Sequence, residues 1–128
     1  MKPELRYVEL KTGYSDNGPA WIGIAEFSKS AQTIYFNGQA FRRTGGSGMT
    51  GNFIDIETGE EYWISGIKKD GNDRHRAGSG RVKIDRHVVD LYLSLVNLKK
   101  LSPSRYEITD ISPTDKQKFD HLENQKIN

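Results

Sequence analysis

The sequence predicts a mainly β protein: a small antiparallel barrel or curled sheet (SH3-like or similar) of five to seven strands, with one or two short helices near the C-terminus. Two observations support this fold class. Short runs of β-branched and aromatic residues recur along the chain, and turn residues such as Gly, Asn, Asp and Pro separate them. Glycine also falls within three of the predicted strands, at Gly23, Gly38 and Gly66, where a strongly coiled sheet favours a residue without a side chain.

The chain has 128 residues, of which 34% are hydrophobic, and this is enough for one domain with a small core. We expect a single all-β domain over residues 1–112, including a possible short helix at 86–96. Residues 113–128 carry balanced charge and are expected to form a C-terminal tail, either a short helix or disordered. Phe119 and Leu122 are the apolar residues that would anchor such a helix.

The first half of the chain predicts three strands, over residues 5–10, 20–27 and 33–41. Their side chains alternate between two faces, which is the period of a strand. Ile22 and Ile24, for example, share one face of the second strand. Residues 11–19 are dense in turn residues and predict a loop, and Asn37-Gly38 marks either a hairpin turn or a bulge.

The second half of the chain predicts four further strands, over residues 53–56, 62–67, 82–85 and 106–111. The glycine-rich residues 42–52 predict a loop before the first of these strands, and residues 57–60 predict a tight hairpin after it. Asp70-Gly71 is a strong turn signal, because Gly accepts positive φ and Asp bonds its own backbone.

Residues 86–96 fit two kinds of secondary structure. Leucine or valine at every second position from 89 to 95 fits a strand. The same stretch also places apolar side chains on one helical face: Val89, Leu93 and Val96. The length of the run favours a helix over a strand, and Asp85 is an acceptable N-cap. We therefore expect a short helix here.

Positive charge is concentrated between residues 66 and 87. Seven Lys or Arg stand there against three Asp, a local net charge of +4 in a chain whose total is +2. Cations that contact the backbone and aromatic faces that stack on bases are the means by which proteins bind single-stranded nucleic acid. The sequence therefore predicts a non-catalytic binding module whose basic loop takes nucleic acid or an acidic protein partner. The candidate binding residues are Trp63, Lys68, Lys69, Arg74, His75, Arg76 and Arg81.

Two observations weaken the nucleic-acid interpretation, and two other functions remain open. The pI of 8.8 is below that of a strongly basic nucleic-acid-binding domain, and tryptophan in a strand is more often core than stacking platform. One alternative is a small enzyme that uses Asp73, His75 and His87 in acid–base chemistry. The other is a homo-oligomeric structural protein whose interface contains exposed aromatic residues such as Tyr35 or Tyr92. The sequence does not determine the oligomeric state.

No motif for a cofactor or a metal ion is evident. The chain has no cysteine, which excludes disulfides and cysteine-ligated metals. His75 and His87, with Asp73 and Asp85, would form a metal site only if two strand ends met, so we expect solvated surface histidines. The glycine-rich segments lack the Lys-Ser/Thr of a P-loop. We therefore predict no cofactor, no metal and no catalytic residue.

The sequence also bears on location. No run of about 18 apolar residues is present, so no membrane span is expected. Residues 1–9 are charged and lack the apolar segment of a secretion signal. We therefore expect a cytoplasmic protein.

Residues 63–80, W-I-S-G-I-K-K-D-G-N-D-R-H-R-A-G-S-G, carry a resemblance together with residues 27–38, F-S-K-S-A-Q-T-I-Y-F-N-G. The chain resembles a group of small bacterial reading frames of unassigned function, over about residues 5–92. Some of these are labelled 1-deoxyxylulose-5-phosphate synthase. Thiamine-diphosphate enzymes of that kind hold magnesium with G-D-G and a later Asn, whereas this chain has Lys69-Asp70-Gly71. The resemblance implies a small bacterial protein and assigns no catalytic residue.

Overall fold

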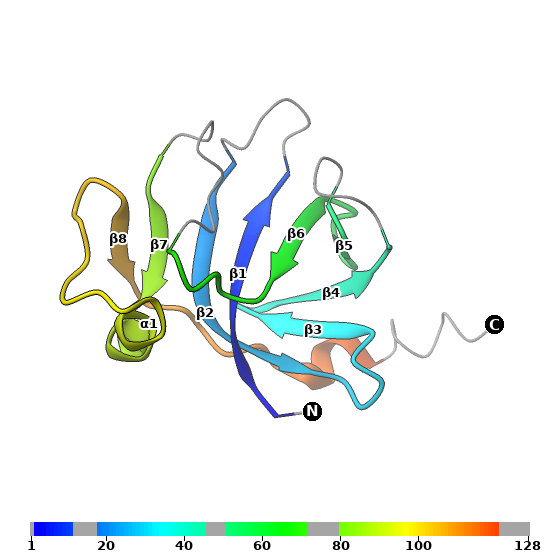
Figure 1. Cartoon of the computed structure of the whole chain (residues 1–128). Helices are drawn as coiled ribbons and strands as arrows, with labels where there is room; N and C mark the ends of the chain where they lie inside the picture. The colour runs from blue at the N-terminus through cyan, green and yellow to red at the C-terminus, as the bar shows by residue number, and fades with distance from the viewer. Residues whose placement is uncertain (1, 12–17, 46–50, 72–79, 121–128) are drawn as a thin grey trace.

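A computed structural model of the chain describes residues 2–11, 18–45, 51–71 and 80–120, and all structural statements below concern these residues (Figure 1). They form one sheet of eight strands. In chain order the strands are β1 Glu4–Leu10, β2 Ala20–Phe27, β3 Thr33–Phe36, β4 Gln39–Arg43, β5 Phe53–Asp55, β6 Glu61–Ser65, β7 Val82–Asp85 and β8 Tyr106–Thr109. The helices are the 3-10 helix η1 Arg86–Val88, the α-helix α1 Val89–Val96 and the 3-10 helix η2 Lys116–Phe119.

Six of the strands close into an antiparallel barrel. Their order is β1-β6-β5-β4-β3-β2, and pairing of β2 with β1 closes the barrel. Tyr7, for example, lies opposite Ile22 on β2 and opposite Ser65 on β6. The predicted mainly β fold with a small antiparallel barrel is therefore confirmed.

The six strands of the barrel lie within the predicted five to seven, and the sheet has eight strands in all because the predicted strand at 33–41 is a hairpin. Asn37 and Gly38 adopt φ values of 52° and 79°, and two consecutive positive φ angles make the tight turn that joins β3 to β4. The strand β4 then continues to Arg43, so the loop predicted at 42–52 begins two residues later than expected.

The strands β7 and β8 lie outside the barrel and run parallel to their neighbours. β7 pairs in parallel with β2, and β8 pairs in parallel with β7. Parallel neighbours need a crossover, and here η1 and α1 supply it between β7 and β8 (Figure 1). The helix predicted from Asp85 onward is present, with Asp85 accepting a hydrogen bond from the His87 backbone N–H at 3.2 Å.

Two hydrophobic cores share the wall formed by β1, β2 and β6. Side chains of one face fill the barrel: Val8, Ala25, Ile34, Phe36, Phe41, Phe53, Tyr62 and Ile64. Side chains of the other face pack against α1, β7 and β8: Leu5, Tyr7, Ala20, Ile22, Val82, Ile84, Val88, Tyr92, Val96 and Tyr106. The alternation along β1 and β2 therefore serves two cores, since apolar side chains on each face are buried.

The C-terminal segment covers a third patch, where the fully buried Phe119 of η2 packs with Tyr35 and Ala40. Leu122 lies outside the described residues. No helix in the described parts of the chain is both long and apolar enough to cross a membrane.

The three glycines expected within strands have different positions. Gly23 lies inside β2, as predicted. Gly38 belongs to the β3–β4 turn, and Gly66 follows the end of β6, with open space where a side chain would point. For Gly38 the hairpin-turn alternative is therefore confirmed, whereas Gly66 was wrongly expected inside a strand, because β6 ends at Ser65.

Candidate functional site

The basic segment after β6 is held on the core that packs against α1, β7 and β8, which we call the outer core. The chain runs from β6 across β1 and β2 towards β7 (Figure 1), and Ile67 packs against the core under α1. Asp70-Gly71 turns as predicted, with a φ of 75° at Gly71 and its N–H bonded to the Lys68 carbonyl at 3.0 Å. The turn therefore presents Lys68 and Lys69, both exposed, on a fixed backbone.

A second loop anchors this turn. The Gly71 carbonyl accepts a hydrogen bond from Arg105 Nη2 at 3.2 Å and one from the Tyr106 hydroxyl at 3.5 Å. The Tyr106 hydroxyl also lies 2.7 Å from that of Tyr92 on α1. The guanidinium of Arg105, an exposed residue, therefore lies beside the turn that follows Lys68 and Lys69. We call these three residues, Lys68, Lys69 and Arg105, the basic surface.

The other described candidates have different surroundings. Arg81 on the approach to β7 donates to Glu107 of β8 at 3.1 Å, so its charge is partly neutralised. Trp63 lies on β6 opposite Glu9 and packs against the outer core, half-buried. Trp63 is therefore mainly a packing residue. Arg74, His75 and Arg76 lie outside the described residues, and their part in binding stays a prediction.

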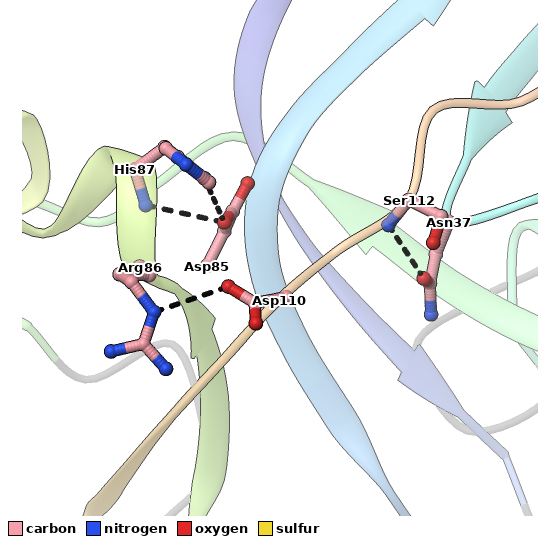
Figure 2. A network of polar contacts seen from close by, with 6 residues as sticks. All are labelled: Asn37, Asp85, Arg86, His87, Asp110 and Ser112. Atoms are coloured by element: carbon pink, nitrogen blue, oxygen red, sulfur yellow. Dashed lines mark hydrogen bonds and ion pairs between the residues drawn. The ribbon is translucent and has the colours of Figure 1, made fainter.

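A second polar cluster lies where β7 and β8 end (Figure 2). The parallel register pairs Asp85 with Thr109, which brings the next residue, Asp110, to the same edge. His87 Nδ1 lies 3.2 Å from Asp85 Oδ1, and one ligand atom from each of Asp85, His87 and Asp110 lies within 4.8 Å of the others. A buried carboxylate, an exposed imidazole and an exposed carboxylate thus converge on one point.

Two contacts hold Asp110 and the segment that follows it. Arg86 Nε donates to Asp110 Oδ1 at 3.1 Å across the gap between η1 and the end of β8. Two residues further on, the Ser112 backbone N–H donates to Asn37 Oδ1 at 3.3 Å, which ties this segment to the β3–β4 turn (Figure 2). Both side chains of the Arg86–Asp110 pair are mostly exposed, so this ion pair contributes little to stability.

Sequence reasoning missed Arg105 and Asp110. Asp85 is the last residue of β7, and Asp110 directly follows β8. These positions bring the two carboxylates together only if β7 and β8 are parallel neighbours, and we expected antiparallel pairing. Arg105 is one cation in a polar loop, and its contact with Gly71 spans 34 residues of sequence.

Of the three residues in the enzyme hypothesis, the structure describes only His87. His87 contacts Asp85, whereas Asp73 and His75 lie outside the described residues. The prediction that Tyr35 and Tyr92 are exposed residues of a subunit interface was wrong, because they are 5% and 0% exposed. Both point into cores within one chain.

Comparison of the chain with protein-family models, curated proteins and solved structures gave no match.

Proposed function

We propose that this protein is a cytoplasmic, non-catalytic binding module that holds single-stranded nucleic acid through its phosphate backbone, on the basic surface of Lys68, Lys69 and Arg105. The contact that carries the proposal is the 3.2 Å hydrogen bond between Arg105 Nη2 and the Gly71 carbonyl. It joins two loops that are distant in sequence, and it sets three exposed cations around one fixed turn.

The surroundings of this turn favour phosphate contacts over base stacking. Tyr92 and Tyr106 are the aromatic residues beneath the turn, and they are 0% and 7% exposed. Rings buried to this extent offer no face to a base. Lysine and arginine side chains on a rigid scaffold suit repeated phosphate groups, whose recognition is independent of sequence.

The test is a titration of a labelled single-stranded RNA, and of the DNA of the same sequence, at two salt concentrations. Each phosphate contact releases a counterion, so the logarithm of the affinity should fall with that of salt with a slope of about 0.7 per contact. Replacement of Lys68 and Lys69 together by Ala should weaken binding and lower this slope by about 1.4.

Arg105→Ala should act in the same direction, and Lys29→Ala is the matched control. Lys29 is an exposed lysine in the β2–β3 turn, which lies away from the segment that follows β6 in Figure 1. If the RNA and the DNA each bind the wild type and a variant with Lys68, Lys69 and Arg105 all replaced by Ala equally well, the basic surface is not the binding site.

An acidic peptide such as polyglutamate distinguishes the other partner class. If polyglutamate binds and neither nucleic acid does, the same surface recognises acidic protein, and the nucleic-acid proposal is wrong. If no polyanion binds at low salt, the binding-module proposal is wrong for this surface.

A further inference from the structure

We propose that Asp85, His87 and Asp110 form a binding site for a divalent transition-metal ion, for which Zn²⁺ is the best match. This proposal is independent of the nucleic-acid surface. The three residues supply one imidazole nitrogen and two carboxylates, all of them ligand types of Zn²⁺, and three protein ligands leave a fourth tetrahedral position for water. Imidazole is a poor ligand for Mg²⁺ and Ca²⁺, which prefer oxygen, so these ions should bind much more weakly.

The distances within the cluster suit one ion. In a tetrahedral site with metal–ligand bonds of about 2.0–2.1 Å, neighbouring ligand atoms lie about 3.4 Å apart. His87 Nδ1 and Asp85 Oδ1 are 3.2 Å apart, and the third ligand atom, from Asp110, is within 4.8 Å of both. Asp110 is 71% exposed and follows the end of β8, so a small rotation of its side chain completes the set.

The carboxylate of Asp85 is held through one oxygen and open at the other. Asp85 is only 8% exposed, and both of its hydrogen bonds, from the His87 backbone and ring, use Oδ1. Among the described contacts, Oδ2 accepts no hydrogen bond. Because Oδ2 is not one of the fully buried atoms, it is open to a cation that approaches from solvent.

The fold fixes the first two ligands before any ion arrives. Asp85 is held at the end of β7 by its role as N-cap of η1, and η1 places His87 two residues later. Arg86 is the local competitor, since its guanidinium binds the Asp110 carboxylate at 3.1 Å. Binding of a metal ion must displace this exposed ion pair, whose own stability is small.

The experiment is isothermal titration of the untagged protein with ZnCl₂, in a background in which His75 and His121 are both replaced by Ala. His87 is then the one imidazole of the chain. We expect saturable one-to-one binding, with a shift of the His87 ring resonances in the NMR spectrum. Circular dichroism of the background variant establishes that it is folded.

Three substitutions and one control test the assignment without removing the cap residue Asp85. His87→Gln and Asp110→Asn should each weaken binding at least tenfold, because each removes a ligand. Arg86→Ala should strengthen binding by about threefold, because it removes the competing cation. Asp90→Asn removes an exposed carboxylate of α1 outside the cluster and should leave the affinity unchanged.

Absence of saturable binding in the background variant overturns the proposal. Binding that survives both His87→Gln and Asp110→Asn also overturns it, because the ion would then be held elsewhere on the surface.

Discussion

Ile111 lies directly against the backbone of Gly23, so that a Cβ atom at position 23 would be 2.9 Å from Ile111 Cδ1. Gly23 lies in the part of β2 where its neighbour changes, since Ile22 pairs with β7 and Glu26 pairs with β3. Ile111, which follows β8, packs against the barrel core there. The segment that leaves β8 therefore helps to close the barrel wall.

Replacement of Gly23 by Ala should destabilise the protein by about 1–2 kcal/mol, because the added methyl group also meets Phe36 Cε1 at 3.0 Å. The measurement is urea unfolding followed by fluorescence. Gly66→Ala is the matched control, because nothing lies within 4 Å of its Cβ position and its φ is not positive. This variant should be neutral or slightly stabilised. Equal losses in both variants would contradict the packing argument.

Loss of the buried ion pair at the end of β1 should cost more stability. Glu9 is 2% exposed, and its carboxylate contacts Lys11 Nζ at 3.2 Å and the Tyr7 hydroxyl at 2.5 Å. Glu9→Gln leaves the Lys11 charge without this carboxylate and should cost about 3 kcal/mol in the free energy of unfolding.

Glu4→Gln provides the comparison on the same strand. Glu4 pairs with Arg6 at the surface, and this change should cost less than about 0.5 kcal/mol. Thermal unfolding of the two variants side by side measures the difference. A Glu9→Gln variant as stable as Glu4→Gln would show that the buried pair does not stabilise the fold.

The hydroxyl groups of Tyr92 and Tyr106 should be energetically coupled, since they lie 2.7 Å apart in the core under the basic turn. Each Tyr→Phe change should cost about 1 kcal/mol, and the double variant should cost less than the sum of the two. A double-mutant cycle by urea unfolding measures this coupling. If the two losses of stability simply add, the two hydroxyls are not energetically coupled.

Titration of Tyr62 should lower the stability of the protein at alkaline pH. Burial in the barrel raises the pKa of Tyr62 above its ordinary value, Glu60 and Asp55 add to the increase, and the hydrogen bond from Gln39 opposes it. Above about pH 10 the unfolded chain loses this proton while the folded chain keeps it, so stability must fall as pH rises through this range.

Tyr62→Phe should therefore lose less stability than the wild type between about pH 9 and pH 11. Chemical unfolding of both proteins over this range is the measurement. Parallel curves would mean that Tyr62 titrates alike in the folded and unfolded chains.

Local sequence signals predicted the elements and the antiparallel barrel, but not the parallel pairs that β7 and β8 make. Alternation along β1 and β2 indicated both strands, and Asp85 as an N-cap indicated the start of the helical segment. The parallel placement of β8 beside β7 left no local signal, because β8 has only four residues and a 20-residue connection precedes it. As a result the meeting of Asp85 with Asp110 could not be predicted.

The sequence by itself determined the β-rich class, the helix after Asp85 and the concentration of positive charge around Lys68, because these follow from residue type and short-range periodicity. Only the tertiary structure decided that Arg105 joins Lys68 and Lys69, that Arg81 is paired with Glu107, and that His87 faces two carboxylates. The physical reason is that these contacts depend on strand register and on packing between distant segments. Both are selected by the burial of two cores and leave little trace in neighbouring residues.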